Sequence, residues 1–243
     1  MPATRRDFLG SGLAAFAAAP AFGEPLRVVC IGGHPDDPES GCGGTLARYA
    51  EAGHAVTVIY LTRGEAGIPG RSHDEAAAIR TAEGESACRI LKAKPVFAGQ
   101  IDGATVADNP AVQRMTQLVR TERPDILLAH WPLDTHKDHQ VASLLAYRAW
   151  LAARPRFGLY FFEVDLGSQT MGFHPTDYVD ITAVREKKKA ALFAHRSQDG
   201  EGVYRQHHEI MENYRGREYG AAAAEAFVRL ARSGGASAMP GNV

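Results

Sequence analysis

Histidine and aspartate residues gather in two short segments of this 243-residue chain, His34-Pro-Asp-Asp37 and Asp134-Thr-His-Lys-Asp-His139. Imidazoles and carboxylates are the ligands of catalytic zinc, which takes three protein ligands and leaves one position open for water. Zinc lowers the pKa of that water to about 7, and a nearby carboxylate can then accept its proton at neutral pH. The two segments therefore contain the residue types needed for hydrolysis by an activated water.

The spacing of the first segment suits two ligands of one ion. His34 and Asp37 lie on one tight turn, and Pro35 restricts the backbone between them. Asp36 then faces the other side of the turn, where a general base would be needed. His139 is a candidate for the third ligand.

The second segment contains two further polar groups, His136 and Asp138. A histidine with a neighbouring carboxylate suits the stabilisation of a transition state. Each segment also has a structural explanation when taken alone. The first can be a solvated turn, and the second can open a helix, whose dipole favours aspartate in the first turn. Their occurrence in one chain favours a metal or catalytic site.

Both segments follow apolar runs that predict buried strands, at residues 26–31 and 125–130. The carboxyl ends of strands in an open α/β sheet form the crevice where ligands bind. The sequence therefore predicts that both segments meet at one edge of a sheet.

Strand and helix patterns alternate along the rest of the chain, which predicts one α/β domain with a mostly parallel sheet flanked by helices. This domain is expected to span residues 24–232, and a Gly/Ala/Ser-rich tail, 233–243, is expected to be disordered. Further strands are predicted at 54–61, 95–98, 159–164 and 178–181. Helices are predicted at 43–52, 74–91, 139–153 and 186–195. A further helix is marked by apolar residues from 112 to 119 and is ended by Arg123-Pro124.

Two histidines and one carboxylate also form the metal site of non-haem iron oxygenases. That class is the alternative to a hydrolase, although an additional base such as Asp36 fits hydrolysis better. Dinucleotide binding is disfavoured, because Gly41-Cys-Gly-Gly44 lacks the GxGxxG pattern and the acidic first segment would repel a pyrophosphate.

At these residues the chain resembles the PIG-L/LmbE-like family of zinc-dependent N-acetylglucosaminyl deacetylases. The resemblance covers nearly everything after residue 25 and implies a Rossmann-like α/β fold with its metal site at the carboxyl ends of the strands. It also implies hydrolysis of the acetamide of an amino sugar. The segments that carry it include 33–48, 56–67, 80–83, 134–139, 161–163, 180–182, 189–198 and 225–227.

The resemblance implies Zn²⁺ as the cofactor, with Fe²⁺ left open, and three metal ligands, namely His34, Asp37 and His139. Asp36 would be the general base and then the acid that protonates the leaving amine. His136 would stabilise the oxyanion, and Asp138 would orient His136.

Two further residues are expected to contact the substrate. Arg80 would bind the polar part of the sugar derivative, and its alternative is a surface pair with Glu83 or Glu85. Glu65 would line the pocket, and its alternative is a solvated loop carboxylate.

The N-terminus contains the pair Arg5-Arg6, followed by Phe8-Leu9 and an apolar, alanine-rich stretch, 10–21. This pattern is typical of a twin-arginine (Tat) signal peptide, predicted to span residues 1–23. It predicts export to the periplasm or the extracellular space. An uncleaved anchor or a disordered tail is the alternative.

The composition of the chain excludes some classes of binding partner. The net charge of −1 argues against nucleic acid, and no later segment is long and apolar enough to cross a membrane. Three scattered cysteines do not form a disulfide framework, and Lys187–Lys189 is expected to be a solvated helix face. The expected partner is a small-molecule or oligosaccharide amino-sugar substrate. A non-catalytic sugar-binding protein and a homo-oligomer are left open.

Overall fold

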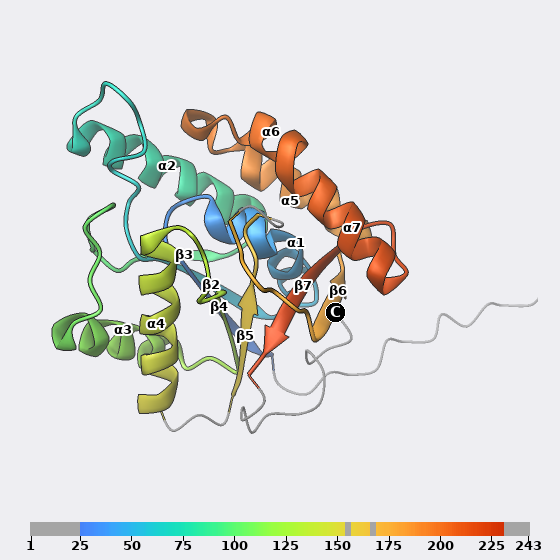
Figure 1. Cartoon of the computed structure of the whole chain (residues 1–243), viewed down its shortest axis with the longest axis horizontal. Coiled ribbons are helices and arrows are strands. Elements are labelled where there is room, and N and C mark those ends of the chain that lie inside the picture. Colours follow the sequence, from blue (N-terminus) through green and yellow to red (C-terminus); the bar gives the residue numbers. More distant parts are fainter. Residues whose placement is uncertain (1–24, 154–156, 166–168, 231–243) are drawn as a thin grey trace, which may run out of the picture.

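The computed structural model describes residues 25–153, 157–165 and 169–230. The predicted signal peptide and the predicted tail lie outside the described residues. Within the described ranges the chain forms one seven-stranded sheet with helices on both faces (Figure 1). This arrangement confirms the predicted α/β fold.

The strands of the described chain are β1 (Arg27–Gly32), β2 (Ala55–Tyr60), β3 (Lys94–Phe97), β4 (Ile126–His130), β5 (Gly158–Phe162), β6 (Asp177–Asp180) and β7 (Ala224–Arg229). Its α-helices are α1 (Asp37–Glu51), α2 (His73–Leu91), α3 (Asn109–Glu122), α4 (Lys137–Ala152), α5 (Arg185–Phe193), α6 (Gly200–Val203) and α7 (Glu209–Tyr219). A π-helix, Tyr204–His208, joins α6 to α7.

The strand order is β3-β2-β1-β4-β5-β7-β6. The strands from β3 to β5 run parallel, whereas β7 runs antiparallel to both β5 and β6. The chain runs outward from β1 to β3 and then returns to β4, on the other side of β1. This reversal between β1 and β4 creates the crevice in which open α/β sheets bind ligands.

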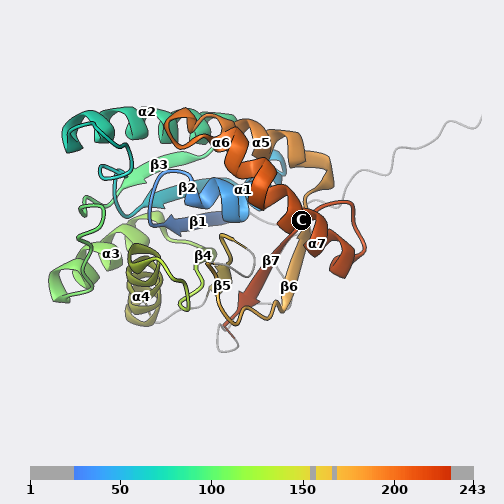
Figure 2. The same cartoon turned by 45° about the horizontal axis from the view of Figure 1, so that its top comes forward.

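Alternate side chains of β1 enter two separate hydrophobic cores. Val28 and Cys30 pack in the core under α1, α2 and α5. Val29 and Ile31 pack in the core under α3 and α4. Helix α7 lies on the same side of the sheet as α1 (Figure 2). Because β1 is buried on both faces, its end is a rigid support for the polar loop that follows.

Helix α1 begins at Asp37, six residues before the predicted start at Gly43. Proline is well tolerated in the first turn of a helix, and Pro38 occupies that position here. The helix is kinked at Cys42, whose φ and ψ are −147° and 18°. After the kink, the carboxylate of Glu225 accepts hydrogen bonds from the backbone N–H groups of Gly44 and Thr45, at 2.9 and 2.7 Å.

A buried ion cluster joins α5, α7 and β7 to α1. Lys188 Nζ lies 2.8 Å from Glu212 Oε1 and 2.7 Å from Glu225 Oε1, and all three side chains are fully buried. The expectation that the lysines at 187–189 form a solvated helix face is therefore wrong for Lys188. The helix turns this residue toward the two carboxylates.

Replacing Lys188 by methionine should destabilise the fold by about 3–5 kcal/mol, because two buried carboxylates lose their cation. Lys187→Met on the same helix should change stability by less than about 1 kcal/mol, because Lys187 pairs with Glu51 at the surface. Urea unfolding of both variants gives the comparison. Equal losses would show that the buried cluster contributes no more than the surface pair.

None of the described helices is long and apolar enough to cross a membrane. The three cysteines are buried and free, and the Sγ atoms of Cys30 and Cys42 lie 3.4 Å apart.

Candidate metal centre

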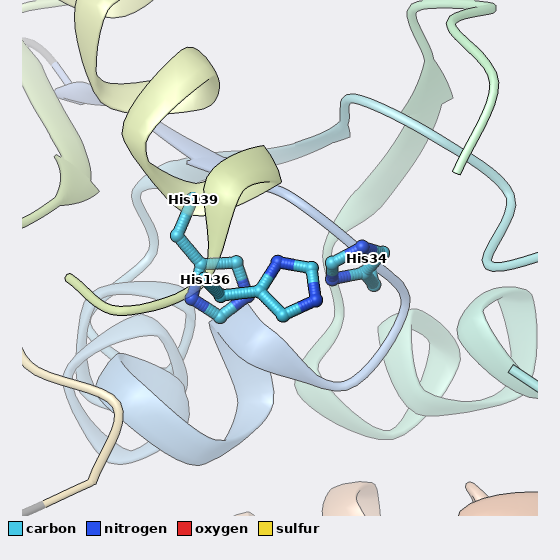
Figure 3. Close-up of side chains that lie close together, drawn as sticks. All are labelled: His34, His136 and His139. Atoms are coloured by element: carbon cyan, nitrogen blue, oxygen red, sulfur yellow. The ribbon is translucent and has the colours of Figure 1, made fainter. Parts of the chain in front are cut away.

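The two polar segments meet at the carboxyl ends of β1 and β4, as predicted. His34 lies on the loop after β1, while His136 and His139 lie at the start of α4 (Figure 3). The ring centroid of His136 is 4.8 Å from that of His34 and 4.7 Å from that of His139. Metal-ligating atoms of all three residues lie within 4.8 Å of one another.

The carboxylate of Asp37 lies between two histidines. Its Oδ2 is 3.2 Å from His34 Nδ1, and its Oδ1 is 3.2 Å from His139 Nε2. Two donor atoms bound to zinc at about 2.0–2.1 Å in a tetrahedral arrangement lie ~3.3 Å apart. Asp37 is therefore placed to share an ion with a histidine on either side. Among the described residues, the sets of three whose ligand atoms all lie within 4.8 Å of one another are His34/His136/His139, Asp37/His130/His139 and His34/Asp102/Asp138. The set His34, Asp37 and His139 stays a prediction.

The carboxylate of Asp134 orients His139. Its Oδ2 lies 3.1 Å from His139 Nδ1, which leaves Nε2 of the same ring directed at Asp37. Metal-binding histidines usually donate their second ring N–H to a carboxylate in this way. The pair is a further sign that His139 is built to bind a metal.

The site favours positive charge. Burial lowers the pKa of His139, but the carboxylates of Asp37 and Asp134 outweigh it and raise that pKa to about 9. Burial is likewise outweighed at His34, where Asp37, Asp102 and Asp138 raise the pKa well above its ordinary value. The same histidines hold the pKa of Asp37 well below its usual range, although burial raises it. A divalent cation would satisfy these carboxylates without protonation of the rings.

His130, at the end of β4, is a site residue that the sequence prediction left out. Its Nε2 lies 3.4 Å from Asp37 Oδ2 and accepts a hydrogen bond from Gly33 N–H at 3.0 Å. Burial, and after it His139, lowers its pKa to about 4, so the ring is neutral. Because His130 Nε2 already accepts the hydrogen bond from Gly33, the geometry favours His34 over His130 as the histidine that binds the metal together with His139.

The predicted base, Asp36, has a left-handed backbone with φ 125°. Arg80 Nη2 donates to Asp36 Oδ2 at 2.9 Å and to the carbonyl oxygen of Pro35 at 2.6 Å. Burial raises the pKa of Asp36 to about 6, with Arg80 opposing the shift and Asp37 adding to it. A carboxylate of this kind is suited to exchanging protons near neutral pH.

Glu39 supports the unusual backbone of Asp36. Its Oε2 accepts a hydrogen bond from the backbone N–H of Asp36 at 3.2 Å, and its Oε1 accepts one from Tyr60 Oη at 2.5 Å. His195 Nε2 lies 3.6 Å from the same Oε2. Glu39, Tyr60 and His195 are fully buried, so this network supports the loop after β1 from the interior of the protein.

Loss of the hydrogen bond between Glu39 and Asp36 should slow the metal-dependent hydrolysis that the sequence predicts. We expect Glu39→Ala to lower kcat by about tenfold or more, because a small displacement of a catalytic group is costly. Glu39→Gln keeps an acceptor oxygen for Asp36 N–H and should retain most of the activity. The measurement is kcat at known metal content. If Glu39→Ala kept the wild-type kcat, Asp36 would not depend on this hydrogen bond.

His136 is exposed, and its Nδ1 accepts a hydrogen bond from the backbone N–H of Asp138 at 3.3 Å. The neutral ring therefore has its proton on Nε2, where it can be donated to an oxyanion. The sequence prediction that the carboxylate of Asp138 orients the His136 ring is wrong. This carboxylate binds His34 Nε2 at 3.2 Å, Thr105 Oγ1 at 2.6 Å and Gly103 N–H at 2.7 Å, because the first turn of α4 directs it there.

Of the two predicted substrate residues, Arg80 lies in the site, bound to Asp36 rather than to Glu83 or Glu85. Glu65 is buried but accepts a hydrogen bond from the backbone N–H of Arg63 at 3.0 Å. Asp102 was missed, and its Oδ1 lies 3.2 Å from His34 Nε2. Its position after β3, at the same edge of the sheet, was the available signal.

Two cavities adjoin at Asp36 and Asp37. The first, here called the metal-site cavity, has about 410 Å³ and is lined by His34, Asp36, Asp37, Ala66, Gly67, Arg80, Asp102, His136, His139, Val164, Gln169 and Gln198. The second, here called the C-terminal cavity, has about 230 Å³ and is lined by Asp36, Asp37, Ser40, Val164, Asp165, Gln169, Leu192, His195, Gln198, Gly200, Val203, His207 and His208. Glu65 lines neither of them.

Residues 29–150 match the sequence profile of the family described as PIG-L, GlcNAc-PI de-N-acetylase. The chain belongs to this PIG-L/LmbE-like family. It is 31% identical over 79% of its length to diacetylchitobiose deacetylase from Thermococcus kodakarensis, of which 76% is covered. It is 28% identical over 67% of its length to 4-oxalmesaconate hydratase from Pseudomonas putida, of which 70% is covered.

A solved PIG-L relative has the same fold. The structure of N,N'-diacetylchitobiose deacetylase from Pyrococcus horikoshii, in complex with the inhibitor MPG, superposes with a TM-score of 0.75 at 25% identity. The match covers 85% of this chain and 84% of that chain. The candidate metal centre described above lies within residues 29–150, which match the family profile.

Proposed function

We propose that this protein is a metal-dependent hydrolase that removes the acetyl group from an N-acetylated amino sugar, with Zn²⁺ as the metal. The observation that carries the proposal is the placement of Asp37 between His34 and His139, with the carboxylate of Asp36 lining the same cavity. Membership of the PIG-L family and similarity to a protein named diacetylchitobiose deacetylase support an amino-sugar substrate.

Held by His34, Asp37 and His139, a divalent metal would supply Lewis acidity and a more acidic water. Asp36 takes the proton of the attacking water as the new C–O bond forms. His136 Nε2–H donates to the developing oxyanion. Asp36 then returns the proton to the nitrogen as the C–N bond breaks, giving acetate and the free amine. Arg80 keeps the Asp36 carboxylate in position during both transfers.

Acetate release from N-acetylglucosamine and from diacetylchitobiose tests this function. The protein is stripped of metal with a chelator and reloaded with Zn²⁺ or Fe²⁺, and its metal content is measured before each assay. Metal-dependent release of acetate is the expected result. A fully loaded protein that releases no acetate from either sugar would overturn the proposal, and the relative named hydratase and the oxygenase alternative would then direct the next assays.

We also propose that the protein is exported through the Tat pathway. The proposal rests on the Arg5-Arg6 pair and the apolar stretch after it, which lie outside the described residues. Cell fractionation of the native chain and of a variant with both arginines replaced by lysine tests it. The native protein should leave the cytoplasm and the variant should stay inside, whereas equal retention of both would exclude this route.

A further inference from the structure

Gln169 lies beside the metal centre, on the segment that follows β5. Its side chain lines both the metal-site cavity and the C-terminal cavity, but the reaction proposed above gives this residue no role. Its amide nitrogen reaches the carboxylate of Asp134, the residue that orients His139. A residue in this position can act on the metal through Asp134 and His139.

Backbone hydrogen bonds hold the Gln169 segment against the segment that precedes α4. Thr135 N–H donates to the carbonyl oxygen of Gln169 at 3.0 Å, and Met171 N–H donates to that of Leu133 at 2.8 Å. Asp134 forms an antiparallel β-bridge between these two contacts. Because the two backbones are held side by side, the side chain of Gln169 starts from a fixed place next to Asp134.

The amide of Gln169 spans both oxygens of the Asp134 carboxylate. Its Nε2 lies 3.2 Å from Oδ1 and 3.4 Å from Oδ2. The backbone N–H of His136 also donates to Oδ1, at 2.7 Å, and His139 Nδ1 lies 3.1 Å from Oδ2. Each oxygen therefore has one donor from its own segment, and the amide adds a donor from the segment after β5. This added donor resists rotation of the carboxylate away from His139.

The contacts also decide which end of the amide faces Asp134. Gln169 Nε2 lies 2.9 Å from His139 Nδ1 as well. A ring that binds metal through Nε2 carries its proton on Nδ1, so Nδ1 donates to Asp134 and cannot accept a hydrogen bond from the amide. Turning the amide over would place its oxygen against two carboxylate oxygens. The amide nitrogen is therefore a donor to Asp134 rather than to the ring.

The outer partners of a metal-binding histidine affect how tightly the metal is held, and loss of such a partner commonly lowers metal affinity by about 10–100-fold. Only 4% of the Asp134 surface is exposed, so water can replace the amide poorly. A buried acceptor that loses its donor is destabilised in its present position. Removal of the amide should therefore loosen Asp134 and, with it, His139.

We infer that Gln169 is a positioning residue, which fixes the carboxylate of Asp134 so that His139 presents Nε2 to the metal. A side chain 35 residues further along the chain than Asp134 thus completes the support of the metal centre. The inference rests on the metal centre of the proposed function and not on the identity of the substrate.

Zinc affinity at equilibrium tests this role. The full chain, stripped of metal, is titrated with Zn²⁺ in competition with a chromogenic chelator. Gln169→Leu removes the donor and keeps most of the side-chain volume, and it should raise the Kd for Zn²⁺ by about tenfold or more. Gln169 is partly exposed, so the substitution does not disturb a packed core.

Gln140→Leu is the matched control. Gln140 Nε2 donates to the backbone carbonyl oxygen of Asp134 at 2.6 Å, so it contacts the same residue but not its carboxylate. Gln140 is exposed, and its substitution should change the Kd by less than about twofold. The visible spectrum of bound Co²⁺ gives a second readout of the ligands. It should change in Gln169→Leu but not in Gln140→Leu.

A double-mutant cycle separates an effect through Asp134 from a general effect of the segment after β5. In an Asp134→Ala background, Gln169→Leu has no carboxylate to act on and should change the Kd by less than about twofold. Equal changes in the Kd for Gln169→Leu and Gln140→Leu would overturn the positioning role. A full effect of Gln169→Leu in the absence of the Asp134 carboxylate would overturn it as well.

The same measurements keep this inference apart from the proposed function. If the wild type bound no Zn²⁺, the proposed function and the role of Gln169 would fail together. If the zinc-bound wild type released no acetate, the proposed function would fail alone, because the Kd values do not depend on turnover.

Discussion

Asp36→Asn should lower kcat by at least about a hundredfold while leaving the metal in place. Asparagine has the same size, tolerates positive φ better than most residues and still accepts a hydrogen bond from Arg80. It cannot take a proton from water. The expected loss therefore reports proton transfer rather than a disturbed loop. The measurement is kcat together with metal content per chain.

The same substitution at Asp108, which caps helix α3 by accepting a hydrogen bond from Ala111 N–H, should leave kcat unchanged and serves as the control. An Asp36→Asn protein with close to the wild-type rate would exclude Asp36 as the base. Loss of the metal from this variant would instead place Asp36 among the ligands.

His139→Ala should abolish metal binding and acetate release together. His139 lies against Asp37 on one ring nitrogen and against Asp134 on the other, which is how a metal-binding imidazole is held. His136→Ala is the matched comparison from the same turn of α4. It should keep the metal and lose activity, because His136 is expected to contact the oxyanion. Metal content after desalting and kcat for each variant test both expectations.

Stoichiometric metal in His139→Ala would contradict the proposed ligand set. Loss of metal from His136→Ala would indicate that the three histidines in Figure 3 bind the ion together, since their ligand atoms also lie within reach of one another.

The fold alone does not decide between reactions. The chain is similar both to a protein named as a deacetylase and to one named as a hydratase. One scaffold can host different chemistry, so only the residues of the site can distinguish hydrolysis from hydration. Asp36 favours hydrolysis, because its carboxylate has a pKa raised to about 6 and lies beside the candidate metal ligands.

Several features of the site could not be predicted, because they depend on contacts between distant parts of the chain. His130 ends an apolar strand and has the pattern of a core residue. Only the pairing of β1 with β4 brings it to Gly33 and Asp37. The expected pairing of Asp138 with His136 followed from their closeness in sequence. In the folded protein, Asp138 faces His34 and the loop after β3 instead.

Helix α7 was also missed, for a physical reason. Its buried side includes Glu212 and Arg215, which are neutralised by ion pairs with Lys188 and Glu163. Such a helix has no apolar stripe, so hydrophobic periodicity cannot reveal it. The strand β7 after it supplies Glu225, whose partners on α1 and α5 are distant in sequence.

The sequence by itself determined the alternation of strands and helices, the two strand ends that meet at the metal centre and the residue types found there. These features are local, because strand and turn propensities and the spacing of His34 to Asp37 depend on neighbouring residues. Tertiary structure decided which nitrogen faces which carboxylate, how Glu39 and Arg80 hold Asp36, and that a second cavity lies beside it. These features depend on side chains from several elements packing together. Burial of those side chains then shifts their pKa values and leaves some of their polar atoms without a hydrogen-bond partner.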